Sequence, residues 1–214
     1  MRIGVDEAGK GPVLGSMFAA AVRADPAALP DGVGDSKGIP PDRRDDLASA
    51  IRAAAAAVAV AEVPVARIDD PETDMNGLTV AAHADAVSGV TPTDGDEPVP
   101  AVADAADTNA VRFERRVGAR CPGVTLRAEH GADAAHPVVG AASIVAKVER
   151  DAHVADLARE FGDVGSGYPG DPVTREFLET YVEENGDLPD CARSSWRTSR
   201  DVLAAADQTA LDEF

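Results

Sequence analysis

The sequence has little cysteine, few aromatic residues and no long apolar run. Its only cysteines among 214 residues are Cys121 and Cys191, which are too far apart to form a metal-binding motif. The absence of an apolar run of about eighteen residues excludes a helical membrane span. Met1 leads directly into a strand-like segment, without the long apolar stretch of a signal peptide. We therefore expect a cytoplasmic protein with two free thiols.

Lysine is also scarce, whereas acidic residues are abundant. The formal net charge is -18, yet 44% of the residues are hydrophobic and recur periodically, so a folded domain is expected rather than a disordered chain. Lysine occurs only at Lys10, Lys37 and Lys147, and arginine replaces it elsewhere. This composition is typical of a halophilic protein from a very salty cytoplasm. The three lysines are then candidates for roles that need a compact point charge.

This acidity argues at first against a nucleic-acid enzyme, because such proteins are usually basic. At roughly 1 M salt, however, the Debye length is only about 3 Å, so distant carboxylates barely repel a phosphate. The same salt weakens binding that depends on counterion release. Contacts at short range would then have to supply most of the recognition.

The apolar pattern indicates strands early in the chain and helices later. We expect strands over 2–6, 14–23, 58–65, 99–103 and 124–128, and helices over 41–57, 76–87, 109–119, 137–157 and 172–184. Asn76 is predicted to cap the second of these helices. The order favours an α/β sheet with helices packed on it, followed by a helical C-terminal part.

Acidic residues fall where three of these strands end. Asp6 and Glu7 follow the first strand, Asp104 ends the fourth, and Asp133 follows the fifth. Neighbouring residues of a regular strand point to opposite faces, so Asp6 and Glu7 share a site only if the strand breaks near Gly9 and Gly11. Clustered carboxylates need a cation, and oxygen ligands select Mg²⁺ or Mn²⁺. Spacing alone leaves open that these are ordinary surface acids.

An ordered set of motifs resembles the ribonuclease HII family, the type 2 RNases H, in an archaeal-like and salt-adapted form. The motifs are Asp6-Glu-Ala-Gly-Lys-Gly-Pro12, Asp35-Ser36-Lys37, Asp104, Glu129-His-Gly-Ala-Asp133 and Ala142-Ser-Ile-Val-Ala-Lys147. The resemblance runs from Arg2 to about Thr198. It implies an RNase H-like fold, with a central mixed five-stranded sheet flanked by helices and a helical C-terminal region.

The resemblance also implies an activity and its residues. Members cleave the RNA strand of RNA/DNA hybrids and the 5′ side of ribonucleotides in duplex DNA, leaving 3′-hydroxyl and 5′-phosphate ends. Two Mg²⁺ or Mn²⁺ ions would be held by the catalytic acids Asp6, Glu7, Asp104 and Asp133. Asp107 lies close to Asp104, but the family pattern selects Asp104 and leaves Asp107 as a helix cap or a solvated acid. Ribonucleotide excision repair and removal of RNA primers during DNA replication are the expected roles.

Further residues are assigned to substrate binding by the same resemblance. The element Gly9-Lys10-Gly11 would approach the ribose 2′-hydroxyl, the only sugar group present in RNA and absent from DNA. Tyr168 would pack on the deoxyribose that follows the ribonucleotide. Phosphate contacts are expected from Ser36, Lys37, Ser143 and Lys147, and Asp35 belongs to the same substrate-binding segment as Ser36 and Lys37. Simpler interpretations are a tight turn for the glycines, a loop anchor for Tyr168 and a solvated charge for Lys37.

The histidines form no catalytic motif. His83, His136 and His153 are expected to be solvated residues on helices or their approaches, and His130 to be structural. Trp196 is expected to pack in the C-terminal part, where Arg193 and Arg197 would supply local positive potential.

The C-terminus has the spacing of a sliding-clamp peptide, with Gln208, Leu211 and Phe214 at Q-x-x-L-x-x-F. Leu211 and Phe214 would form a hydrophobic plug for the clamp, proliferating cell nuclear antigen, although only one aromatic is present. A frayed or self-docked tail is the alternative. We expect a catalytic core over residues 1–160, a helical region packed on it over 161–206 and a flexible tail over 207–214, in a monomer.

Two other functions remain open from the sequence. A DNA junction resolvase of the RNase H-like superfamily would share the clustered acids but would not need Lys10 or Tyr168 to sense ribose. A non-catalytic clamp-binding module would carry its acids only as salt adaptation and would show no metal-dependent turnover. The related type 3 RNases H are disfavoured, because they carry an additional N-terminal domain.

Overall fold

The computed structural model describes residues 1–34, 39–93 and 97–212. Within these residues, five strands form one sheet in the order β3-β2-β1-β4-β5. The strands are β1 (Arg2–Ala8), β2 (Met17–Ala24), β3 (Ala57–Val63), β4 (Val99–Asp104) and β5 (Val124–Glu129). β1 pairs antiparallel with β2 and parallel with β4, which in turn pairs parallel with β5. The mixed five-stranded sheet is therefore confirmed.

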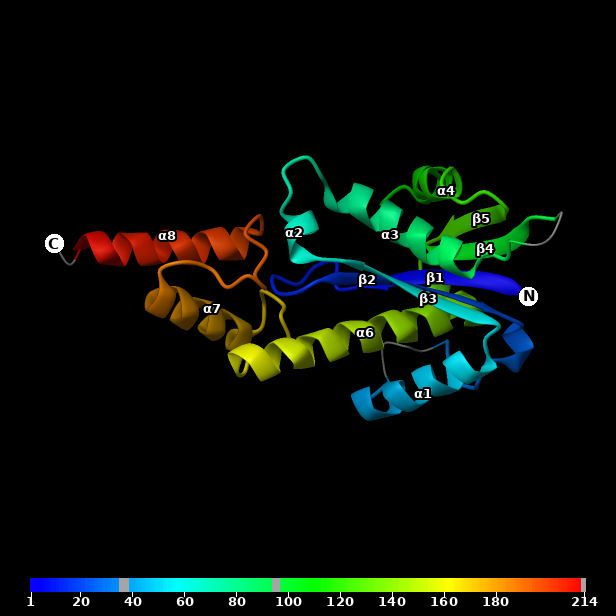
Figure 1. Cartoon of the computed structure of the whole chain (residues 1–214), viewed down its shortest axis with the longest axis horizontal. Helices are drawn as coiled ribbons and strands as arrows, with labels where there is room; N and C mark the ends of the chain where they lie inside the picture. Colours follow the sequence, from blue (N-terminus) through cyan, green and yellow to red (C-terminus); the bar gives the residue numbers. More distant parts are fainter. Residues whose placement is uncertain (35–38, 94–96, 213–214) are drawn as a thin grey trace. The chain divides into compact units, whose positions relative to one another are not determined.

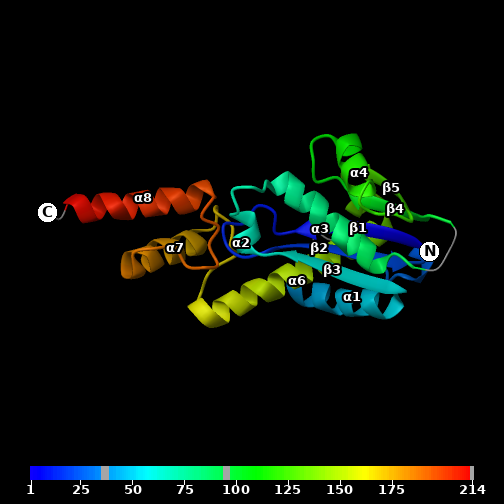
Figure 2. The ribbon, with the colours of Figure 1, turned by 45° about the horizontal axis from the view of Figure 1, so that its top comes forward.

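Helices cover both faces of this sheet. The described helical elements are η1 (Pro26–Ala28), α1 (Pro41–Ala54), α2 (Val65–Ile68), α3 (Met75–Val90), α4 (Ala110–Gly118), α5 (Ala132–Ala135), α6 (Pro137–Phe161), α7 (Pro172–Asn185) and α8 (Arg197–Asp212). Figure 1 shows α3 and α4 on one face, and α1 with the first part of α6 on the other. The turned view in Figure 2 shows the same two layers. No helix in the described part of the chain is long and apolar enough to cross a membrane.

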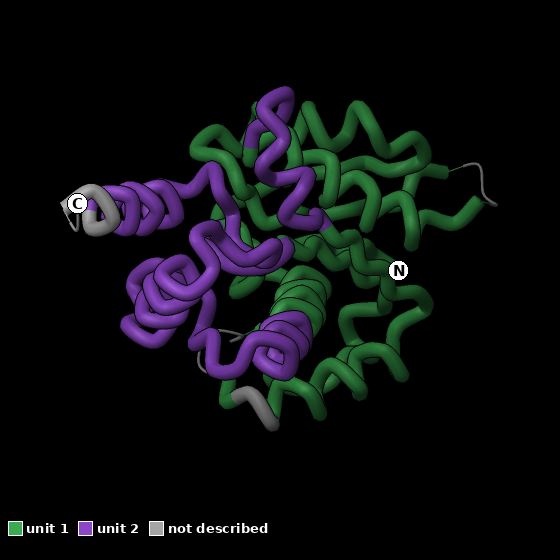
Figure 3. The backbone as a smooth tube through the Cα atoms, turned by 60° about the vertical axis from the view of Figure 1, so that its left-hand side comes forward, with its two compact units in different colours: residues 1–10, 17–62, 75–150 green, residues 11–16, 63–74, 151–214 purple. Residues whose placement is uncertain are grey.

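The chain divides into two compact units, which Figure 3 colours separately. Unit 1 contains residues 1–10, 17–62 and 75–150, and it holds the sheet. Unit 2 contains residues 11–16, 63–74 and 151–214, and it holds the end of α6 together with α7 and α8. Each unit has its own apolar core: Ile144 and Ile51 belong to that of unit 1, and Leu14 and Leu178 to that of unit 2.

Two glycines set how closely α6 approaches the sheet. A Cβ atom placed on Gly4 of β1 would overlap the backbone of Val138. One placed on Gly140 of α6 would overlap the carbonyl of Val33 and lie 2.8 Å from the carbonyl oxygen of Asp133. The absence of these two side chains lets the start of α6 pack directly on β1. That packing brings α6 side chains to the position where β1 carries its acids.

Most boundaries agree with the sequence pattern, but three expectations were wrong. The second strand begins at Met17 instead of Leu14, because Gly15 adopts a positive φ of 77° and Leu14 forms an isolated bridge with Ala192. The helix from Pro41 ends at Ala54 because Ala57 already belongs to β3. Asn76 lies inside α3, so it does not cap that helix.

Candidate active site

Three of the four predicted acids lie on the same face of the sheet in unit 1. Gly4 and Asp6 are two residues apart on β1, so both face α6, and Ser143 of α6 is hydrogen-bonded to Asp6. Asp104 ends β4 and faces the same side as Val102, which packs on the core beneath α6. Oδ1 of Asp104 accepts a hydrogen bond of 2.9 Å from the backbone nitrogen of Ala132, the residue before Asp133.

Glu7 follows Asp6 directly in β1 but points to the other face of the sheet. β1 continues regularly through Ala8, where Asp6 pairs with Ala20 and Glu7 with Ala19, and the break comes only at Gly9, whose φ is 85°. Glu7 therefore points to the opposite face, where Nε2 of His83 lies 2.8 Å from its Oε2. The strand break expected near Gly9 therefore comes after both acids, because the antiparallel pairing with β2 holds Asp6 and Glu7 in the ladder.

Asp6 is a buried carboxyl group with other carboxylates close to it, and both features shift its pKa. Burial raises the pKa of Asp6 to about 7, and the charges of Glu7 and Asp104 act in the same direction. The hydrogen bond from Ser143 opposes this shift only partly. Asp6 is 5% exposed, so little water is available to stabilise its charge. A cation bound here would remove the repulsion that favours the protonated form.

The pKa of Glu7 is shifted in the opposite direction. Burial on its own would raise its pKa, but the hydrogen bond and charge of His83 and the charge of Lys10 hold that pKa below its usual value. Lys10 also donates to the carbonyl of Ala106 at 2.7 Å and reaches Oδ1 of Asn76 at 3.5 Å. Lys10 therefore links the end of β1 to the loop after β4 and to the first turn of α3.

The donor set fits a hard divalent cation, because four carboxylates provide only oxygen ligands. Asp6, Asp104 and Asp133 come from neighbouring elements on one face, and Asp133 is 6% exposed. As the side chains stand, no three His, Cys, Asp or Glu residues within 1–34, 39–93 and 97–212 form a ready metal-binding group. The carboxylates match the ion in chemistry: Asp6, Asp104 and Asp133 share one face, and Glu7 follows Asp6 directly in β1.

Asp107 is separate from this group. Its carboxylate accepts bonds from the backbone of Asn109 and from Arg112, whose Nε lies 2.8 Å from Oδ2. The hydrogen bond from Arg112 is the main reason why the pKa of Asp107 lies far below its usual range. Asn109 is the residue that caps α4, so Asp107 is neither a helix cap nor a solvated acid.

The substrate residues predicted in unit 1 have mixed environments. Ser143 is fully buried and accepts a 2.6 Å hydrogen bond from Nζ of Lys147, one turn further along α6. Ser143 thus connects Asp6 to Lys147. Gly9 is buried and Lys10 is half-buried. Asp35, Ser36 and Lys37 lie outside the described residues.

Two further predicted residues meet in unit 2. Tyr168 is 44% exposed, and a Cβ atom on Gly11 would lie 3.7 Å from its Cε1. The carbonyl of Gly167 accepts hydrogen bonds from the backbone nitrogens of Val13 and Leu14 at 2.8 and 3.2 Å. The loop that carries Tyr168 is therefore tied to the segment that carries Gly11.

Sequence reasoning missed two positioning residues. His83 was expected to be solvated, yet it is fully buried and meets Phe113 edge-on at 5.0 Å. Arg193 was expected to supply local positive potential, and the structure places it fully buried, where it donates to the carbonyl of Gly15 at 2.9 Å and lies over the ring of Trp196. Trp196 in turn donates to the carbonyl of Gly11 at 3.3 Å. His83 and Arg193 each lie far along the chain from Glu7 and Gly15, so no local pattern indicated these contacts.

Two of the other histidines also have polar partners. His153 accepts a hydrogen bond of 3.1 Å from the backbone nitrogen of Ser16, and His136 lies 3.0 Å from Glu129. Both are half-buried, so neither is the solvated residue that was expected. His130 is exposed.

Comparison with known proteins agrees with this arrangement. Residues 3–199 match the family model for ribonuclease HII. A ribonuclease HII from the halophilic archaeon Haloarcula marismortui is 63% identical over 215 residues, covering 100% of both chains. The ribonuclease H2 structure from Pyrococcus horikoshii is 34% identical with a TM-score of 0.87, covering 96% of this chain and 98% of that one. A structure of the PCNA:RNase HII complex from Archaeoglobus fulgidus is 35% identical with a TM-score of 0.84, covering 100% of both chains.

Proposed function

The chain belongs to the ribonuclease HII family, whose members cleave RNA in RNA/DNA hybrids, and from this premise we propose how it acts. It cuts the RNA strand of hybrids and the 5′ side of ribonucleotides embedded in duplex DNA, leaving 3′-hydroxyl and 5′-phosphate ends. The observation that supports this most directly is the burial of Asp6 beside Glu7 and Asp104 at the ends of two parallel strands.

The catalytic and metal-holding residues of the proposal are Asp6, Glu7, Asp104 and Asp133. Two Mg²⁺ or Mn²⁺ ions bound there would supply activation of the attacking water and neutralisation of the leaving oxygen. Ser143 orients the Asp6 carboxylate through its hydrogen bond. His83 orients Glu7, and Lys10 holds the loop after Asp104 through the carbonyl of Ala106.

Recognition of the ribose is assigned to the Gly9-Lys10-Gly11 element and Tyr168. Gly11 has no side chain, so backbone atoms can approach the 2′-hydroxyl closely. The exposed ring of Tyr168 lies next to Gly11, where it would pack on the adjoining deoxyribose. Phosphate contacts are proposed for Lys147, with Ser143 beside it, and for Ser36 and Lys37, while Asp35 is proposed as a further substrate-binding residue of the same segment.

The deciding experiment uses a DNA duplex that carries a single ribonucleotide, incubated with Mg²⁺ at high KCl, with both product ends mapped. We expect one cut on the 5′ side of the ribonucleotide, and no cutting by the folded Asp6→Asn and Asp133→Asn variants. Full activity in EDTA would reject the scheme. Cleavage of all-DNA junctions without cleavage of hybrids would favour a junction resolvase, and no metal-dependent turnover would favour a non-catalytic clamp-binding module.

A second proposal is that the C-terminus binds the sliding clamp through Gln208, Leu211 and Phe214. Supporting it, a relative of 35% identity is known from a complex with PCNA. Gln208 is exposed on α8, which runs to Asp212, and Phe214 lies outside the described residues. Deletion of residues 208–214 is expected to abolish clamp binding and to leave hybrid cleavage unchanged; retained binding would contradict the assignment.

The cellular setting is also proposed. Relatives from Haloarcula marismortui and Halobacterium salinarum, together with the net charge of -18, support adaptation to a salty cytoplasm. Ribonucleotide excision repair and primer removal are the processes that such a cleavage would serve. A monomer with a core over 1–160, a helical region over 161–206 and a clamp-binding tail over 207–214 remains our prediction.

A further inference from the structure

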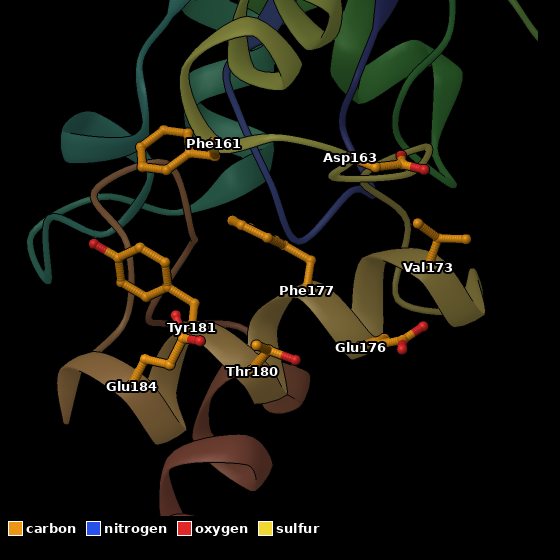
Figure 4. A pocket seen from close by; sticks show the side chains of 8 residues that line it. All are labelled: Phe161, Asp163, Val173, Glu176, Phe177, Thr180, Tyr181 and Glu184. Carbon is orange, nitrogen blue, oxygen red and sulfur yellow. The ribbon is translucent and has the colours of Figure 1, made fainter.

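Unit 2 contains a pocket lined by three aromatic rings, drawn in Figure 4. Phe161 comes from the last turn of α6, and Phe177 and Tyr181 come from successive turns of α7. Their ring centroids lie 6.1, 6.1 and 6.0 Å apart, and the ring planes are inclined to one another by 62°, 73° and 53°. All three side chains are half-buried, so part of each ring still faces the pocket.

Acidic side chains line the same pocket. Asp163, Glu176 and Glu184 are exposed around it, and Val173 and Thr180 complete the described lining. None of the eight described lining residues is basic. The pocket therefore combines three aromatic rings with three carboxylates, and its chemistry is complementary to a cation.

The shape of the ring cluster narrows the class of cation. A guanidinium group is planar and stacks flat on a single ring. Three mutually inclined rings line this pocket, and a rounded cation that carries methyl groups can contact more than one of them. A small hydrated metal ion would gain from the carboxylates but would have to lose water to touch the rings. At roughly 1 M salt the Debye length is about 3 Å. Salt therefore screens the attraction of a cation to distant carboxylates more strongly than its attraction to a ring in direct contact.

We propose that this pocket binds a small quaternary ammonium compound, with Phe161, Phe177 and Tyr181 around its methyl groups and Glu176 and Glu184 compensating its charge. The site belongs to unit 2 and uses none of the four acids assigned to catalysis. It is thus independent of the proposed cleavage, and either assignment can fail without the other.

The probe is choline, compared with 3,3-dimethyl-1-butanol, which has the same shape but no charge. Binding is followed by the NMR shifts of the phenylalanine and tyrosine rings at constant ionic strength in KCl. We expect choline to shift the rings saturably and to bind about tenfold more tightly than the neutral alcohol, since the cation–π attraction is lost in the alcohol. Equal affinity would overturn the proposal, as would tighter binding of methylguanidinium than of choline.

Matched variants on one helix separate the pocket from general surface charge. The double substitution Glu176→Gln and Glu184→Gln removes two lining charges, whereas Glu179→Gln and Glu183→Gln removes two exposed charges of α7 that do not line the pocket. We expect the first pair to weaken choline binding several-fold and the second pair to leave it unchanged. Tyr181→Leu should weaken it about tenfold, and hybrid cleavage reports that each variant is folded. Equal effects of the two charge pairs would contradict the site.

Discussion

Nε2 of His83 lies 2.8 Å from Oε2 of Glu7, and the histidine has no exposed surface. The two residues are 76 positions apart, and the contact joins α3 to the face of β1 opposite Asp6. The ring of Phe113 packs edge-on against the imidazole of His83. His83 is therefore a positioning residue that fixes the direction of the Glu7 carboxylate without touching substrate.

Substitution of His83 should weaken metal use more than folding. His83→Ala is expected to lower cleavage about 10–100-fold at limiting Mg²⁺, as is usual when a partner of a ligand carboxylate is removed, with partial recovery at high Mg²⁺. His83→Gln keeps a donor and should recover part of the loss. The matched control, His136→Ala, removes a half-buried partner of Glu129 and should have little effect. An unchanged Mg²⁺ requirement in His83→Ala would contradict the role.

The metal-free protein should become less stable as the pH rises. The pKa of Asp6 is about 7 in the folded chain and near 3.8 when unfolded, so the folded state binds this proton more tightly. The contribution of this proton to the free energy of unfolding is complete below pH 4 and is lost as the pH rises through 7. The loss is at most about 4 kcal/mol. Thermal unfolding in EDTA from pH 5 to pH 8 measures the loss, and the unfolding temperature is expected to fall over this range.

Asp6→Asn provides the control for that measurement. The amide cannot ionise, so the variant should lose this part of the pH dependence and be more stable than the parent at pH 8 in EDTA. Added Mg²⁺ should stabilise the parent but not the variant. A variant less stable than the parent under these conditions would show that Asp6 is not under repulsive strain.

The close approach of α6 to β1 should tolerate no side chain at Gly4. Gly4→Ala would force a Cβ atom into the backbone of Val138 and is expected to destabilise the fold by about 3 kcal/mol, with loss of activity. Gly118→Ala is the control, since its Cβ atom would lie 3.9 Å from that of Leu126, an ordinary contact. Denaturant unfolding compares the two, and equal stabilities would contradict the packing argument.

Tyr168 should matter most for single ribonucleotides. Tyr168→Ala is expected to lower cleavage of a single-ribonucleotide duplex about tenfold more than cleavage of a long hybrid, because one aromatic contact is lost at the RNA–DNA junction. Since the ring is 44% exposed, stability should hardly change. Tyr181→Phe keeps its ring in unit 2 and serves as the control. Equal losses on both substrates would refute the assignment.

Local sequence patterns predicted what depends on neighbouring residues. The start of α4 next to Asn109 and the end of β4 at Asp104 follow from periodicity. The direction of Glu7 did not, because it depends on how far the antiparallel pairing with β2 extends past Asp6. The burial of His83 and of Arg193 depends on contacts across 76 and 178 residues, which no local pattern contains.

The same distinction applies to the site as a whole. Acids at strand ends could be recognised in the sequence, and the parallel pairing of β1 with β4 places Asp6 and Asp104 on one face. The hydrogen bond of Ser143 to Asp6 could not be predicted, because it requires the close approach of α6 to β1 that Gly4 and Gly140 permit. Sequence spacing places Ser143 and Lys147 on one helical face but does not say what that face contacts.

The central claim is that Asp6, Glu7, Asp104 and Asp133 jointly hold divalent cations. Its most direct test is Mn²⁺ titration, followed by electron paramagnetic resonance, of the parent chain and of the Asp6→Asn, Glu7→Gln, Asp104→Asn and Asp133→Asn variants in high KCl without nucleic acid. We predict saturable binding by the parent and a large loss of affinity in each variant, Glu7→Gln included. Binding that none of the four substitutions alters would contradict the account.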